Sequence, residues 1–311
     1  MALLTWQEFT AAARPQGGSI PEDLRDFVEN VSPVDRPALG LFRKSRVNTT
    51  FIEWMEDSLP SRAHNAYIEG VQATDQAQTT PSRTFTHVQQ FARWGYVSDT
   101  QRSVEHKGFN DMYLYQEQKA VESTLNDIEH ALHRGSAATG ATSAARQFGG
   151  LLNVLSTNFT DSSGTTLTEE VFGDLIQLYV DNNVDIRPNT AFVNALIKRT
   201  ISLYSTKLRY NIPAMAKTQM LVVDKYESDF GNVDIYFSRD QLKSASKTTY
   251  GNSVVLLDPS YFEVGFLTPL RTETLARDGL RTRFQVSAEA TMIYRTEKAG
   301  GGGTGFVPYI A

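Results

Sequence analysis

The chain has 311 residues, 41% of them hydrophobic, so it can bury the core of one large or two medium-sized domains. Its 30 basic and 35 acidic residues give a net charge of −5, which excludes the overall basic character of a general nucleic-acid-binding protein. The absence of cysteine excludes disulfides and thiol chemistry, and no stretch approaches the roughly 18 apolar residues of a membrane span. We therefore expect a soluble protein of the cytoplasm with no membrane partner.

Residues 1–45 predict a helical arm. Thr5 and Glu8 have the spacing of a capping box, and Leu24 and Phe27 lie on one face of a second short helix. A small basic cluster ends the arm. It is either a solvated turn or a contact with an acidic neighbour or with DNA. The cluster consists of Arg43, Lys44 and Arg46.

Two strand-like segments, 46–56 and 84–98, are rich in β-branched and aromatic residues, and a mostly polar segment joins them. This pattern predicts either a protruding hairpin or an ordinary sheet inside one domain. Aromatic residues fall on both faces of the strands, which favours a hairpin that another surface covers. We expect aromatic anchors either against that covering surface or at the hairpin's own base, among Phe51, Trp54, Phe91 and Trp94.

The segment 109–135 predicts one long helix. Leu114, Val121 and Ile128 recur every seven residues, and Gly135 stands where a C-cap glycine would end the helix. About 25 residues would make a rod of nearly 40 Å. Such a length is unusual for a helix inside a globular domain.

After a small-residue connector at 135–150, the pattern alternates between helix and strand. Helices are predicted from a cap at Thr166 to Tyr179 and from Asn189 to about Tyr204, and a strand at 220–228 is expected to pair with a strand at 233–238. Long apolar strands follow from Ser253 to Lys298. The glycine-rich end, AGGGGTGF, is expected to be a terminal tail.

Three fragments resemble parts of a protein kinase, but their context argues against that activity. Asp229-Phe230-Gly231 is the triplet that holds magnesium in kinases, yet it precedes the glycine-rich segment, whereas a kinase has the opposite order. His133-Arg134-Gly135 lacks the aspartate that would accept the substrate proton. We therefore interpret the first triplet as a tight turn between two strands.

No other catalytic or metal-binding pattern occurs. The sequence has no nucleophile elbow, no Walker loop and no zinc-protease motif. His130 and His133 beside Glu129 form at most half a metal site, and a polar helix end is the better interpretation. We assign no catalytic, cofactor-binding or metal-binding residue and expect no cofactor.

The order of elements resembles that of the major capsid proteins of tailed bacteriophages, which have the Hong Kong 97 type capsid fold. The resemblance covers essentially the whole chain and is strongest after Ser228. It rests on packing and turn phrases in the family's order. These are LFRKSRVNTTFIEWMEDSL, EQKAVESTLNDIEHALHRG, ARQFGGLL, SDFGNVDIYFSRD, LLDPSYFEVGFLTPLRTETLARDG and EKAGGGG.

The resemblance implies an α+β fold with five parts. They are an N-terminal arm (1–45), an extended loop or β-hairpin (46–98), a peripheral domain with a spine helix (99–150), an axial domain (151–252), and return strands of the peripheral domain with a C-terminal tail (253–311). The interface between subunits would then include the hairpin and the arm, at Leu24, Phe27, Phe51, Trp54, Phe91, Trp94 and the basic cluster.

The resemblance also implies a function. The chain would assemble non-covalently, as hexamers and pentamers, into the icosahedral head shell that encloses double-stranded DNA. It would contact that DNA non-specifically on the inner face. Portal protein and a separate scaffold protein would be partners, and assembly in the host cytoplasm would place the chain in the virion. Two alternatives remain: an encapsulin-type nanocompartment shell protein and a soluble α/β enzyme.

Overall fold

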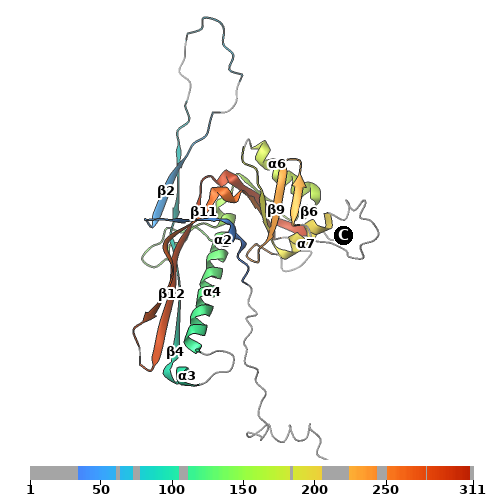
Figure 1. The fold of residues 1–311 in the computed structure, drawn as a ribbon. Coiled ribbons are helices and arrows are strands. Elements are labelled where there is room, and N and C mark those ends of the chain that lie inside the picture. Colours follow the sequence, from blue (N-terminus) through green and yellow to red (C-terminus); the bar gives the residue numbers. More distant parts are fainter. Residues whose placement is uncertain are drawn as a thin grey trace, which may run out of the picture.

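The computed structural model describes residues 34–60, 64–72, 78–104, 111–182, 185–204, 224–243, 251–277 and 279–308. It contains an elongated unit built on a four-stranded sheet, a second unit built on a seven-stranded sheet, and a two-stranded hairpin. Figure 1 shows the hairpin projecting beyond the first unit, with the second unit to the side. Helices and strands both contribute, so the α+β class predicted from the sequence is confirmed.

The first sheet has the strand order β1-β11-β12-β4, and only β1 runs parallel to its neighbour. The even-numbered residues of β12 from Phe284 to Met292 are buried, as the alternating sequence predicted. They contribute to the core beneath helix α4. The strands are β1 (Arg43–Arg46), β11 (Phe262–Leu275), β12 (Arg281–Tyr294) and β4 (Gln89–Ser98).

Helix α4 (Met112–Arg134) confirms the predicted long helix. Asp111 caps its first turn, and Ile128 and Leu132 in its second half are fully buried. Gly135 is the C-cap residue, as predicted, and its amide donates to the Ala131 carbonyl, although its φ of −54° is not left-handed. Glycine is needed there because a Cβ atom would lie 2.6 Å from the Ala131 carbonyl oxygen.

Short elements surround α4. They are α2 (Pro37–Leu41), α3 (Asp99–Ser103) and α5 (Leu151–Val154), with the single turns η1 (Pro259–Tyr261) and η2 (Glu297–Ala299).

The second sheet has the order β5-β13-β10-β7-β9-β8, with β6 pairing with β13. Side chains of β7 and β10 alternate between two cores, one shared with the first sheet and one beneath α6 and α7. Burial on both faces explains why β10 is entirely apolar from Val254 to Leu257. The elements are β5 (Asn158–Asp161), β6 (Thr166–Leu167), α6 (Glu169–Asp181), β7 (Thr190–Val193), α7 (Ala195–Tyr204), β8 (Lys225–Ser228), β9 (Gly231–Phe237), β10 (Asn252–Leu257) and β13 (Gly300–Pro308).

The glycine-rich end is not a terminal tail, so that expectation was wrong. It forms β13, which lies inside the second sheet between β5 and β10. At Gly302 the φ is +130° and a Cβ atom would lie 2.1 Å from the Val254 carbonyl oxygen. Glycine is required for this close approach of neighbouring backbones. The assignment of 253–311 to the peripheral domain is therefore also wrong for β10 and β13.

Of two local structures predicted in the second unit, one is wrong and one is confirmed. The helix expected from 189 begins only at Ala195, because 190–193 form the buried strand β7. Asn194 then caps α7 by accepting a hydrogen bond from the Ile197 amide (2.9 Å). The turn expected at Asp229–Asn232 does join β8 and β9, and Gly231 supplies the positive φ of +143°.

The predicted continuous strand 84–98 is divided at Val88. β3 (Ser82–His87) pairs with β2 (Phe51–Glu56) to form the hairpin, whereas β4 belongs to the four-stranded sheet. The boundary of the extended loop at 98 therefore needs correction to about 87. The described parts of the long connection between β2 and β3 contain no regular element.

A buried carboxylate attaches the end of the arm to α4. Glu129 is 1% exposed and accepts hydrogen bonds from the backbone amides of Ala38 (2.9 Å) and Leu39 (2.8 Å). Because α2 has no side-chain cap of its own, Glu129 satisfies the amides that its first turn leaves unpaired. His133, one turn along α4, contacts the same carboxylate at 3.2 Å. It is fully buried, so the predicted polar helix end was wrong there.

Glu297 lies in the turn η2, which connects β12 of the first sheet to β13 of the second, and it binds the loop before β5. Its carboxylate accepts hydrogen bonds from the Ser156 amide (3.0 Å) and the Thr157 amide (3.2 Å). Burial alone would raise the pKa of Glu297, but hydrogen bonds from Thr157 and Ser156 to its ionised form outweigh burial and lower the pKa. The carboxylate therefore stabilises the fold at neutral pH.

We predict that this stabilisation is lost in acid. A group with a lowered pKa in the folded state contributes fully above its unfolded pKa of about 4.3, and its contribution falls as the pH drops through the folded pKa. The free energy of unfolding of the wild type should therefore fall more steeply below about pH 4 than that of Glu297→Gln. Denaturant titrations at several pH values measure both curves, and parallel curves would contradict the assignment.

Candidate subunit interface

One face of the hairpin carries an aromatic cluster that nothing in the described chain covers. Phe51 pairs across the strands with His87, and Phe85 lies next along β3. The three ring centroids lie 5.1 to 5.7 Å apart. Phe51 and Phe85 are 42% and 51% exposed, and Met55 extends the apolar surface. We call Phe51, Met55, Phe85 and His87 the hairpin face.

The opposite side of the hairpin packs on the first sheet. The Trp54 ring meets Tyr294 of β12 edge-on at 5.0 Å, and the hydroxyls of Thr86 and Thr291 lie 3.1 Å apart. These contacts fix the base of the hairpin on the sheet, so Trp54 is an anchor within the chain. This is one of the two positions that the sequence allowed for the hairpin's aromatic residues.

The other predicted interface residues lie in different environments. Phe91 is 7% exposed and belongs to the core beneath α4, so its prediction as a contact between subunits needs correction. Trp94, on the same strand, points the other way and is 65% exposed. Strand alternation separates these two residues because their positions differ by an odd number. Leu24 and Phe27 lie outside the described residues.

The basic cluster is a strand, so its interpretation as a solvated turn was wrong. Arg43, Lys44 and Arg46 lie on β1, at the edge of the four-stranded sheet, and are exposed. Arg43 lies 4.0 Å from Glu263 of the neighbouring strand. Exposed charges at a sheet edge also discourage unwanted strand pairing.

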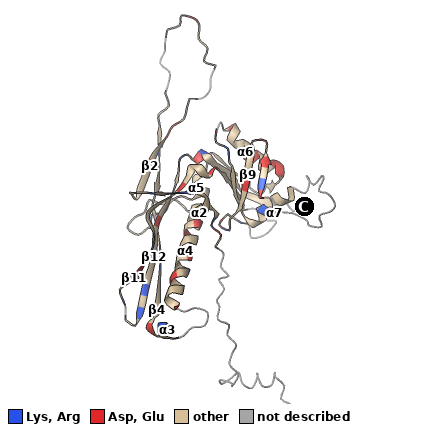
Figure 2. Cartoon of the chain, in the orientation of Figure 1, with Lys and Arg blue, Asp and Glu red and all other residues tan. Residues whose placement is uncertain are grey.

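The outer face of the first sheet adds a second exposed aromatic group. Trp94 and Tyr96 both lie on this face, and the Arg281 guanidinium stacks over the Tyr96 ring at 5.2 Å. In the coloured ribbon of Figure 2, positions of basic residues lie toward the free ends of β11 and β12, positions of acidic residues lie along α4, and both signs occur in the second unit. The charges are therefore distributed in patches of both signs.

Sequence reasoning missed several exposed apolar residues in the long hairpin connection. Tyr67, Ile68 and Val71 are 60%, 85% and 56% exposed around a turn at Gly70. The available signal was their occurrence in an otherwise polar segment. Apolar side chains on a protruding turn favour contact with another protein surface.

The described residues do not form an evident catalytic site. Ser238, His133 and Glu129 lie close together, but both Ser238 (3.1 Å) and Glu129 (3.2 Å) contact the same ring nitrogen, Nε2. A nucleophile and an orienting carboxylate would instead contact opposite ring nitrogens. All three side chains are buried. In the described ranges no group of three or more His, Cys, Asp or Glu residues is arranged to hold a metal ion.

None of the helices in the described part of the chain is both long enough and apolar enough to cross a membrane.

Comparison with known proteins identifies the fold. The chain is similar to the capsid protein of Cyanophage A-1(L), with a TM-score of 0.69 and 12% identity over 93% of this chain and 97% of that one. It is also similar to an encapsulin from Synechococcus elongatus PCC 7942, with a TM-score of 0.59 and 11% identity over 100% of this chain and 98% of that one. The fold is therefore that of Hong Kong 97 type shell proteins, as the resemblance implied.

The family is shown by sequence. A major capsid protein of Escherichia phage Phieco32 is 30% identical over 116 residues, which span 37% of this chain and 33% of that relative. The family model for the SU10 major capsid protein matches residues 4–306. The chain belongs to this family of phage major capsid proteins, which confirms the resemblance drawn from the sequence.

Proposed function

We propose that the chain self-assembles by non-covalent packing into the icosahedral head shell of a tailed bacteriophage. The observation that carries this proposal is the uncovered hairpin face on a member of a capsid protein family. Exposed aromatic clusters of this kind are typical of protein interfaces.

The shell implies a set of partners. Copies would gather as hexamers and pentamers, a portal protein would occupy one vertex, and a separate scaffold protein would guide assembly. Packaged double-stranded DNA would meet the inner face non-specifically. The chain would be made in the host cytoplasm and remain in the virion. The small net charge of the chain supports this role, because a subunit with a large net charge would repel its neighbours in the shell.

The proposed role is structural and not enzymatic. The capsid family model matches nearly the whole chain. The serine–histidine–glutamate group in the described part is buried away from solvent, and its side chains pack inside the subunit. A soluble α/β enzyme remains the competing class. Such an enzyme would be a monomer that turns over a substrate.

Electron microscopy of the expressed protein tests the function. Closed shells, or rings of five and six subunits, are the expected result. A population of monomers alone would reject the shell and favour the soluble enzyme instead. The content of particles separates the two shell functions: packaged double-stranded DNA beside a portal favours the phage head, and an enclosed enzyme favours the encapsulin. The encapsulin is the second candidate because one similar structure has that function.

Non-covalent cohesion gives a further prediction. A lysine–asparagine crosslink occurs within the wider family, but no pair is assigned in this chain. Mature particles boiled in detergent should give a single band near 34.7 kDa. A ladder of multimers would show that covalent bonds join the subunits.

A further inference from the structure

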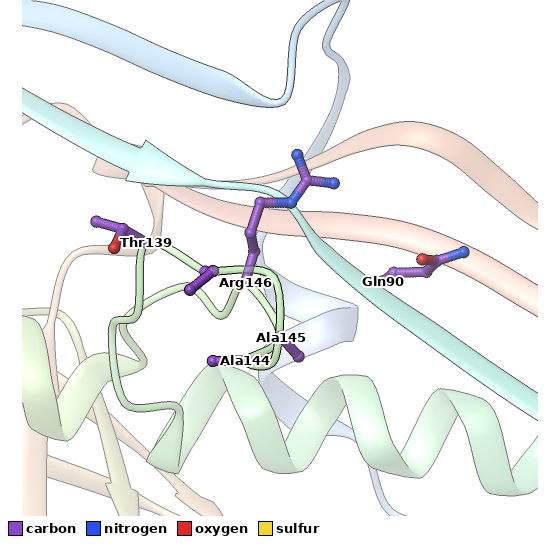
Figure 3. A pocket seen from close by; sticks show the side chains of 7 residues that line it. Gln90, Thr139, Ala144, Ala145 and Arg146 are labelled. Carbon is purple, nitrogen blue, oxygen red and sulfur yellow. The ribbon is translucent and has the colours of Figure 1, made fainter.

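An arginine without an anionic partner stands beside a hollow in the connector. Residues 138–147 fold back on themselves and, with Gln90 of β4, line a hollow of about 530 Å³. Figure 3 shows that alanine side chains form part of its wall and that Arg146 extends away from α4. Arg146 is half-buried, yet its guanidinium makes no hydrogen bond or ion pair with the described residues.

The position of the Arg146 side chain is constrained. Gly140 has a φ of +82°, and a Cβ atom there would lie 2.4 Å from Cγ of Arg146. The stem of the arginine therefore packs directly on the glycine backbone. A guanidinium on a stem held in this way can bind a carboxylate or phosphate in a defined geometry.

The turn Tyr67–Val71, in the connection between β2 and β3, carries a charge opposite to that of Arg146. Glu69 has no hydrogen bond or ion pair in the described chain, and it stands between the exposed residues Ile68 and Val71. The Val71 amide donates to the Ile68 carbonyl at 3.1 Å, which closes the turn. The turn therefore presents a carboxylate flanked by apolar side chains.

The other acidic residues of the described hairpin already have partners. Glu53 pairs with Arg83 at 3.4 Å, Glu56 accepts from Thr296, and Asp57 accepts from the Ser58 amide. Among these carboxylates of the described hairpin, Glu69 is the one with neither a hydrogen bond nor an ion pair.

We propose that the turn Tyr67–Val71 of one copy binds in the connector hollow of a second copy, where Glu69 pairs with Arg146. The apolar side chains of the turn fit against the alanine wall, and the opposite charges fix the register. Figure 1 shows the hairpin connection far from the connector in one chain, so the contact requires two copies. This inference rests on the proposed self-assembly.

Charge reversal tests the pairing. Arg146→Glu and Glu69→Arg should each lower the yield of assembled particles roughly tenfold or more, because like charges would then meet at the contact. Glu69 is exposed, and glutamate at 146 keeps a methylene stem against Gly140, so the denaturation midpoint of the unassembled subunit should change little in either variant. Glu170→Arg, at an exposed position on α6, controls for the change in net charge of Glu69→Arg.

The double variant Arg146→Glu with Glu69→Arg should restore the yield to near that of the wild type. No restoration, or normal assembly of either single variant, would overturn the pairing while leaving the proposed function intact. Failure of the wild type itself to assemble would instead reject the proposed function. If Arg146→Glu assembles normally but releases packaged DNA, Arg146 binds nucleic-acid phosphate and the pairing is also overturned.

Discussion

Alanine at both Phe51 and Phe85 should abolish shell formation while the subunit still folds. The two rings are about half exposed in the single chain, so their removal should cost the subunit only about 1 kcal/mol of cross-strand packing. In an assembled shell the same rings would be buried against a second copy. Central aromatic contacts of this kind contribute about 2–4 kcal/mol each to an interface. Every copy in a shell would lose that contribution.

Phe91→Ala is the matched control, because Phe91 belongs to the subunit core. It should destabilise the subunit by about 3–5 kcal/mol. Denaturant unfolding measures stability, and electron microscopy with sedimentation measures assembly. If the variant with alanine at Phe51 and Phe85 forms normal shells, the hairpin face is not an interface.

The second large effect is expected at Glu129. Replacing it with alanine leaves the backbone amides of Ala38 and Leu39 buried without an acceptor, and also removes the contact with His133. Each unpaired buried donor costs about 1–3 kcal/mol, so the loss of stability should be about 2–5 kcal/mol. The arm end should also detach from α4 and become accessible to protease.

Glu122→Ala provides the comparison on the same helix. Glu122 pairs with Arg36 and is 46% exposed, whereas the Arg36 side chain is 15% exposed. Asn126 still accepts from Nε of Arg36 (2.7 Å) in the variant, so the loss should stay near ~1 kcal/mol. Denaturant unfolding of both variants measures the difference. Equal losses in the two variants would show that Glu129 does not hold the arm.

The sequence predicted the elements that have a clear period. The alternation of β12 follows directly from burial of one face and is confirmed, and the long helix α4 is also confirmed. The predicted seven-residue row of α4 is buried only at Ile128, because Leu114 is 54% exposed and Val121 is half-buried. The apolar run of β10 likewise reflects burial on both faces. These patterns, together with their order along the chain, were enough for the resemblance to a capsid family.

Elements determined by distant contacts could not be predicted. A run of glycines has no strand propensity of its own. In β13 the glycines are needed because the neighbouring backbones lie too close to leave room for side chains. The division of the 84–98 strand at Val88 depends on which sheet each half joins. Glu129 contacts an amide 91 residues away, so nothing near it in sequence indicates its role.

The candidate interface was predicted in part. The sequence located the aromatic residues on two-faced strands, but it could not say which face the rest of the chain would cover. Phe91 and Trp94 illustrate this limit, because they lie three residues apart on one strand and only Trp94 is exposed.

Footprinting of the hairpin with hydroxyl radicals before and after assembly tests the central claim most directly. Oxidation of Phe51 and Phe85 should be strong in the dissociated subunit and should fall sharply in the assembled particle. Phe91, buried within the subunit, should remain unlabelled in both states. Equal oxidation of Phe51 and Phe85 in the two states would contradict the account, because the hairpin face would then remain uncovered in the shell.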